Sequence, residues 1–239
     1  MPTATRHHNN FPAFSLLVLS IIGVILILPI AMLKPITYMG ASWRKPLIGS
    51  LLAIICIAGI SAAIFPEGCT RTTHKSKSKT VESETETPAP QKFAIDFKGH
   101  HPNCGKFEIH TVHLMGKEYC AACTGLALGA FIVLAGTLFH FFIGCNIMEK
   151  FGLWAIFAGQ IGVTLGLFQF KFRSFIRMAF NAIFVIACFL ILAGTDSVAG
   201  NLLLDLYVLS LILYWLFTRI LLSKWDHMQI CSECGFSCT

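Results

Sequence analysis

The sequence predicts an all-α integral membrane protein with about six transmembrane helices and a small metal-binding loop between the second and the third. Of its 239 residues, 55% are hydrophobic and 13% are charged, whereas about 25% are charged in a typical soluble domain. Six apolar segments approach the roughly 20 residues that a helix needs to cross the hydrocarbon core. We expect these spans at Phe11–Leu33, Leu47–Phe65, Thr124–Cys145, Leu153–Phe170, Phe175–Ala193 and Leu202–Leu222.

The spans and the segments between them divide the chain into five parts. We predict a two-helix membrane anchor (1–65), a flexible charged linker (66–92), a His/Cys metal-binding loop (93–123), a four-helix membrane core (124–222) and a cysteine-containing C-terminal tail (223–239). The first span is too long for a secretory signal and no A-x-A site follows it, so we expect an uncleaved anchor. The linker, rich in Thr, Ser, Lys and Glu, has too little apolar surface to offset its ordering entropy.

The distribution of Lys and Arg predicts the orientation. With six spans, fourteen of the 18 basic residues lie on the side that carries both termini and the cysteine loop, and the others are Lys34, Arg44, Lys45 and Lys150. The positive-inside rule therefore predicts a multi-pass cell-membrane protein with both termini and this loop in the cytoplasm. The formal net charge of +6 follows from this excess. No basic stripe is interleaved with aromatic residues, so we expect no nucleic-acid partner.

The metal-binding loop is predicted from paired ligands. His101-x2-Cys104 is followed after fifteen residues by Cys120-x2-Cys123, which is the spacing of a zinc site with one histidine. Two ligands separated by two residues can reach one tetrahedral ion from a single tight turn, and Gly105 suits such a turn.

A short hairpin is predicted inside this loop. Residues 107–113, F-E-I-H-T-V-H, alternate between apolar and polar side chains, as a half-buried strand does. We expect Val112 to belong to a small apolar floor and His110 to face water. Both His110 and His113 are interpreted as solvated loop histidines, with the alternative that either replaces His101 as a ligand.

The C-terminal tail repeats the cysteine pattern. Cys231-S-E-Cys234-Gly235 has the C-x2-C-G form, and Cys238 follows it. Four spans separate Cys123 from Cys231, so the chain returns to the same membrane face and the tail can meet the loop.

Four interpretations of the cysteines stay open. The first is one structural zinc on the loop pairs, with the tail separate or binding a second metal. The second is an all-cysteine site made of Cys120, Cys123, Cys231 and Cys234. The third is an iron–sulfur cluster, whose typical cysteine runs are absent. The fourth is a redox pair of Cys120 and Cys123 at a helix N-terminus, where the helix dipole favours a thiolate.

The predicted core helices carry small residues at spacings suited to close helix contact, namely Gly125, Gly129, Gly159, Gly162 and Gly166. Polar residues also lie at apparent membrane depth, namely His140, Gln160, Gln169, Asn181 and Asp205. An acid inside a span is a functional candidate. We expect Asp205 to be interfacial or hydrogen-bonded to a neighbouring helix.

Cys104 and the segment C-A-A-C-T-G-L-A-L-G at residues 120–129 resemble a family of uncharacterised prokaryotic multi-span membrane proteins. Members carry an isolated Cys, a loop of similar length, and a C-x-R-C-T-G-I-x-x-G-like start of a membrane helix. The resemblance covers roughly Asn103–Gly129 and the succession of spans after it, and this chain has Ala122 where the family pattern has Arg. It implies that Cys104, Cys120 and Cys123 belong to one site, and it implies no activity.

These patterns predict a multi-pass membrane protein with a structural zinc site. We expect a non-catalytic subunit or scaffold of a membrane assembly, in which small-residue helix faces contact other subunits or a second copy. The alternatives are a membrane thiol–disulfide oxidoreductase or redox sensor using Cys120 and Cys123, and a metal transporter, for which His140, Cys188 and Asp205 are few and scattered. Enzyme classes built on a P-loop, H-E-x-x-H, G-x-G-x-x-G or Ser/His/Asp grouping have no support in the sequence.

Overall fold

The structure is a computed structural model. It describes residues 11–33, 42–64, 97–98, 101–102, 110–114, 116–144, 147–169 and 172–234. The predicted linker (66–92), the ligands Cys104 and Cys238, and residues 103–109 lie outside the described residues.

Six helices in the described part of the chain are long and apolar enough to cross a membrane, so the predicted number and order of spans are confirmed. They are α1 (Phe11–Met32), α2 (Arg44–Ile64), α4 (Ala121–Thr137) with its π-helical continuation η2 (Leu138–Ile143), α5 (Ile147–Leu167), α6 (Ser174–Ala199) and α7 (Leu202–Cys234).

Helix α7 differs most from its predicted span. It continues past Leu222 to Cys234, because the sequence holds no glycine or proline between Leu222 and Gly235 that would end it. Cys231 and Cys234 therefore lie in the last turns of a helix, and the part of the predicted tail from 223 to 234 continues α7.

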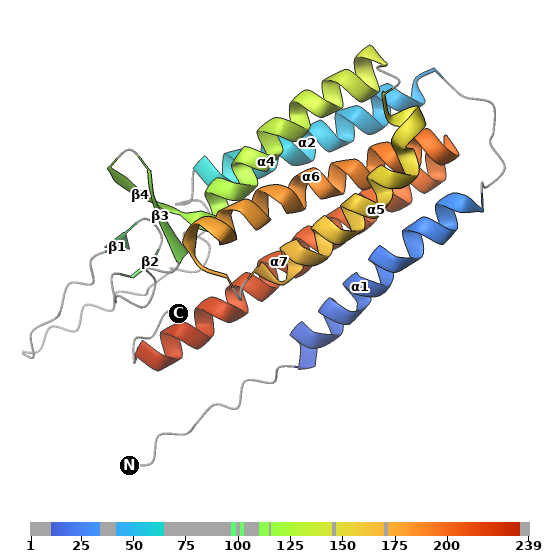
Figure 1. The fold of residues 1–239 in the computed structure, drawn as a ribbon. Helices are drawn as coiled ribbons and strands as arrows, with labels where there is room; N and C mark the ends of the chain where they lie inside the picture. Colours follow the sequence, from blue (N-terminus) through green and yellow to red (C-terminus); the bar gives the residue numbers. More distant parts are fainter. Residues whose placement is uncertain are drawn as a thin grey trace, which may run out of the picture.

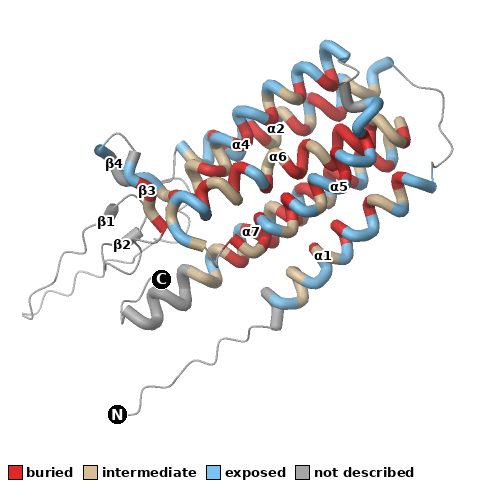
Figure 2. The backbone as a smooth tube through the Cα atoms, in the orientation of Figure 1, coloured by how far each residue is buried: buried red, intermediate tan, exposed pale blue. Residues whose placement is uncertain are grey.

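The helices form one bundle in which α6 lies at the centre (Figure 1). Helix α6 contacts α1, α4, α5 and α7. Of the residues in its apolar stretch, 56% are buried inside the bundle, the largest share among the six spans. Figure 2 shows the same contrast, since the outer helices carry long exposed stretches on the side away from the bundle. Those stretches are apolar and suit contact with lipid.

The glycines of α4 allow the closest helix contact. A Cβ added at Gly125 would overlap the carbonyl oxygen of Met178 on α6, and one added at Gly129 would lie 2.7 Å from the carbonyl oxygen of Ala182. The predicted role of these glycines in helix packing is confirmed, and the helix they contact belongs to the same chain.

The glycines of α5 contact α6 in the same way. A Cβ added at Gly159 would lie 2.7 Å from the carbonyl oxygen of Ala187, and Gly162 and Gly166 face Ala187 and Phe184. The predicted small-residue faces of both α4 and α5 are therefore covered by α6.

Two short strand pairs precede α4. Strands β3 (Thr111–Leu114) and β4 (Lys117–Cys120) are antiparallel, with Thr111 opposite Cys120. Their tight turn includes Gly116 at φ +76°, a conformation that glycine adopts without strain. Strands β1 (Phe97–Lys98) and β2 (His101–Pro102) pair in the same manner.

Strand β3 begins at Thr111, within the predicted alternation over 107–113, of which residues 107–109 lie outside the described residues. Val112 is buried as predicted, against Ala121 and Met178. Helices α2, α5 and α7 end, and α4 and α6 begin, on the side of the bundle that carries this hairpin (Figure 1). We call this side the hairpin end.

Candidate functional site at the hairpin end

The second cysteine pair lies where the hairpin joins the membrane helix. Cys120 is the last residue of β4 and the N-cap of α4, with extended backbone angles, and Cys123 follows in the first turn of the helix. Thr124 Oγ1 donates a hydrogen bond to the Cys120 carbonyl oxygen at 2.9 Å, which steadies this first turn. Both thiols are partly buried. They therefore extend from one strand-to-helix junction, as two ligands of a common ion or a reactive pair must.

A buried guanidinium is within electrostatic range of this pair. Arg219 of α7 is 5% exposed, and its charge interacts with both Cys120 and Cys123. Its Nε donates to Asn181 Oδ1 at 2.8 Å, and its Nη2 donates to Asn181 and to Gln169 Oε1. These neutral amides orient the guanidinium without cancelling its charge, so it can stabilise thiolates.

A second buried guanidinium belongs to the same polar layer. Arg177 of α6 is 1% exposed. Its Nη1 donates to His110 Nδ1 at 2.6 Å, and its Nη2 donates to Asp226 Oδ2 at 2.9 Å. Among these side chains, two guanidinium groups face one carboxylate, so the layer beneath the cysteine pair carries an excess positive charge.

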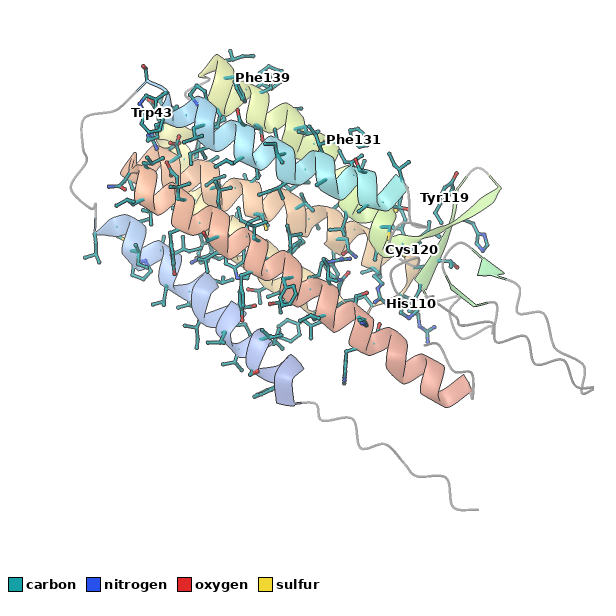
Figure 3. The ribbon with its side chains drawn as sticks, turned by 180° about the vertical axis from the view of Figure 1, so that it is seen from behind. Trp43, His110, Tyr119, Cys120, Phe131 and Phe139 are labelled. Carbon is teal, nitrogen blue, oxygen red and sulfur yellow. The ribbon has the colours of Figure 1, made fainter. Side chains whose placement is uncertain are left out.

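The prediction that His110 faces water is wrong. His110 is 2% exposed, because it directly precedes β3, which contacts α6, and Arg177 of α6 donates to its imidazole. Figure 3 shows His110 at the hairpin end. His113, by contrast, is exposed as predicted. Since His110 Nδ1 accepts from an arginine, which can only donate, that nitrogen is already in use and is not a metal ligand.

The described residues include only part of the predicted ligand set, since Cys104 and Cys238 lie outside them. Cys120 and Cys123 lie at the junction, His101 lies in β2, and Cys231 and Cys234 lie at the end of α7. Within the described residues, no group of three or more His, Cys, Asp or Glu side chains could hold a metal ion. The complete ligand set stays a prediction.

Sequence reasoning missed Arg177 and Arg219 as parts of a site. Both were counted only as basic residues on one side of the membrane, although both lie within predicted spans. A cation inside a span is costly and marks a functional or paired position, so this signal could have identified them. Gln169 and Asn181, which were noted as polar at membrane depth, are the partners of Arg219.

A second polar group lies at the opposite end of the bundle. His140 and Asp205, which seemed scattered in the sequence, come together there with Arg44, Lys45 and Asp196. The expectation that Asp205 interacts with a neighbouring helix is confirmed, since it pairs with Arg44 of α2.

Two cysteines inside the bundle act as small hydrophobic residues. Cys56 of α2 and Cys188 of α6 are buried in the hydrophobic core and line one small cavity of about 70 Å³.

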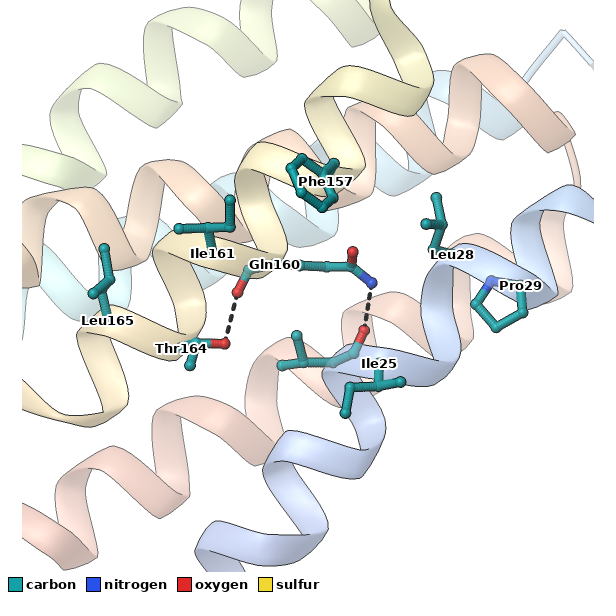
Figure 4. Close-up of a pocket in the computed structure, with 9 residues that line it drawn as sticks. Ile25, Leu28, Pro29, Phe157, Gln160, Ile161, Thr164 and Leu165 are labelled. Atoms are coloured by element: carbon teal, nitrogen blue, oxygen red, sulfur yellow. Dashed lines mark hydrogen bonds between the residues drawn. The ribbon is translucent and has the colours of Figure 1, made fainter.

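A larger apolar cavity of about 550 Å³ lies between α1 and α5 (Figure 4). The polar side chain in its wall is satisfied, since Gln160 Nε2 donates to the Val24 carbonyl oxygen at 2.7 Å. Thr164 Oγ1 donates to the Gln160 carbonyl oxygen at 2.8 Å. These bonds explain how Gln160 is accommodated at membrane depth.

Comparisons of the chain with family models, with curated proteins and with solved structures find no match, so the resemblance in the cysteine segment stays a prediction.

Proposed function

We propose that this protein is a multi-pass membrane protein with a structural zinc site at the hairpin end, formed by Cys120 and Cys123 together with His101 and Cys104. The observation that carries the proposal is the position of two thiols at one strand-to-helix junction, within electrostatic range of the buried Arg219 guanidinium. By the positive-inside rule, we infer that this end of the bundle faces the cytoplasm.

The charge of the polar layer supports the metal. A Zn²⁺ ion bound by three thiolates and one neutral histidine carries a net charge of −1. The two guanidinium groups of Arg177 and Arg219 and the one carboxylate of Asp226 have a net charge of +1. This charge would compensate the −1 of the zinc site at a partly buried position. Four protein ligands would leave no open position for a substrate, so the site would stabilise structure and perform no catalysis.

The proposed role is that of a non-catalytic subunit or scaffold in a membrane assembly. A metal would stabilise the short β-strands, which are too small to be stable alone, and would hold them at the start of α4. Because α6 covers the small-residue faces of α4 and α5, we place the docking surface for other subunits at the hairpin, where Tyr119 is exposed.

The test is the zinc content of the purified full-length chain, measured by elemental mass spectrometry with a thiol count before and after chelation. We expect about one zinc per chain, lost in Cys123→Ser and in His101→Ala. The control is Cys188→Ser, which changes a core cysteine outside the site and should keep its zinc. A chain that neither contains zinc nor binds it on incubation would contradict the proposal.

Thiol redox chemistry is the second candidate, and the N-cap position of Cys120 favours it. A helix N-terminus and a nearby guanidinium both stabilise a thiolate without any metal. In this case Cys120 and Cys123 would form a disulfide under mild oxidation, and His101→Ala would leave that reaction unchanged. Mass spectrometry of alkylated peptides after redox titration distinguishes the two candidates.

A further inference from the structure

Five ionisable side chains converge at the end of the bundle opposite the hairpin. Arg44 and Lys45 come from the start of α2, His140 from η2, Asp196 from α6, and Asp205 from the first turn of α7. We call them the Arg44 cluster. Trp43, labelled in Figure 3, marks this end of the bundle.

Arg44 connects the two carboxylates. Its Nη1 lies 2.6 Å from Asp196 Oδ1 and donates a hydrogen bond to Asp205 Oδ2. His140 Nε2 lies 3.0 Å from Asp196 Oδ2. The cluster therefore fastens the start of α2 to α6 and α7.

With the His140 imidazole counted as neutral, the buried part of the cluster carries one more negative charge than positive charges. The side chains of Asp196 and Asp205 are 0% exposed and that of Arg44 is 11% exposed, so two carboxylates share one buried guanidinium. Lys45 is at the limit of ion pairing, with its Nζ 3.8 Å from Asp196 Oδ2 and its side chain 38% exposed, and solvent screens such a pair. An uncompensated buried charge is costly, and one bound proton would remove it.

The hydrogen bonds indicate which carboxylate takes the proton. Asp196 faces Arg44, His140 and Lys45. Asp205 pairs with Arg44 through Oδ2 and is within electrostatic range of Lys45 and Asp196. Among the described residues neither buried Oδ1 accepts a hydrogen bond, but Asp196 Oδ1 lies 2.6 Å from Arg44 Nη1, whereas the ion pair of Asp205 leaves its Oδ1 without a cation. A charged oxygen without a donor is much costlier to bury than a neutral one.

The start of α7 does not supply donors to Asp205. Asn201 Oδ1 accepts from the backbone amides of Leu203 and Leu204, and the Asn201 carbonyl oxygen accepts from the amide of Asp205 itself, so these three amides are satisfied by the residue before the helix. Helix α1 contains no charged residue, and Glu149 and Lys150 at the start of α5 are exposed, where solvent screens their charges.

We propose that Asp205 is a proton-binding site of the membrane bundle, occupied at neutral pH by a proton on the carboxyl oxygen that no donor reaches. Loss of this proton would leave two carboxylates competing for Arg44 and would loosen the start of α2. The site is independent of the proposed zinc site, because the two lie at opposite ends of the bundle.

Equilibrium unfolding of the purified chain in mixed detergent micelles between about pH 5 and pH 9 tests the proposal. Exposed aspartates ionise near pH 4, so the native chain would hold one proton more than the unfolded chain. Each such proton raises the unfolding equilibrium constant about tenfold per pH unit, and stability falls as pH rises. Asp205→Asn mimics the protonated carboxyl, so we expect its pH slope to be shallower by this factor.

Two control variants are matched to the test. Asp226→Asn removes the carboxylate that pairs with a buried guanidinium at the hairpin end. Its stability should depend on pH as steeply as that of the wild type, because Asp205 is unchanged. Lys45→Gln should also show the wild-type pH slope of stability, because solvent screens the charge of Lys45. A steeper slope in Lys45→Gln would identify Lys45 as the counter-charge and overturn the proposal.

Two further results would overturn it. One is an equal pH slope in the wild type and Asp205→Asn. The other is failure of Asp205→Asn to fold. If this carboxyl is protonated in the native chain, folding does not need its negative charge. Greater stability of Asp205→Asn than of the wild type at pH 9 would support it.

Discussion

Substitution of Gly125 by alanine tests how the helix packing positions the cysteine site. The added Cβ would overlap the Met178 carbonyl oxygen and lie 2.8 Å from Asn181 Cβ. Because a backbone oxygen cannot rotate away, α4 and α6 must separate. Overpacking of this kind costs about 1–3 kcal/mol, and the better helix propensity of alanine returns about 0.5–1 kcal/mol. We therefore expect a net loss of about 1 kcal/mol in the free energy of unfolding.

The same change would disturb the site, because Asn181 also holds Arg219. The assay is equilibrium unfolding in detergent micelles, followed by zinc content at a fixed free zinc concentration. Gly59→Ala is the matched control, since no atom lies within 4 Å of its added Cβ, and it should be neutral or slightly stabilising. If Gly125→Ala were as stable as Gly59→Ala, the close contact of α4 with α6 would be refuted.

Three further predictions concern single side chains. Arg219→Gln removes the charge beside the cysteine pair, and we expect slower alkylation of the metal-free thiols at a fixed pH than in the wild type; an unchanged rate would exclude electrostatic stabilisation of a thiolate. Asp226→Asn leaves the buried Arg177 guanidinium without its carboxylate, so the free energy of unfolding should fall by about 3 kcal/mol, as measured in detergent micelles; a loss near zero would show that the pair is solvated. Gln160→Leu removes the hydrogen bond to the Val24 carbonyl and should cost only about 0.6 kcal/mol by the same measurement; a loss above 2 kcal/mol would indicate a larger structural role.

The two polar layers give the bundle different ends. At the hairpin end, guanidinium groups outnumber carboxylates beside thiols that can become anionic. At the opposite end, buried carboxylates outnumber guanidinium groups, and a proton can restore balance. In both layers the same rule decides the chemistry, because a buried charge persists only where a partner or a bound ion compensates it.

Much of the fold follows from local patterns in the sequence. Backbone groups inside a bilayer must bond within their own segment, so long apolar segments become helices, and six such segments were identified. Four of these segments lie between the cysteine loop and the end of α7. Because four is an even number, both lie on the same side of the bundle. The junction of Cys120 and Cys123 with a membrane helix also follows from the sequence, because the apolar run begins directly after them.

The sequence alone determined that glycines such as Gly125 allow close contact, but the tertiary structure decided that α6 is the helix they contact. The same holds for the charges, since Arg44 and Asp205 lie 161 residues apart in the chain and Arg177 and His110 lie 67 residues apart. Periodicity reports only which face of a helix or strand is apolar. Which faces meet depends on the order in which the helices pack, so the partners of a buried charge are set by the assembled bundle.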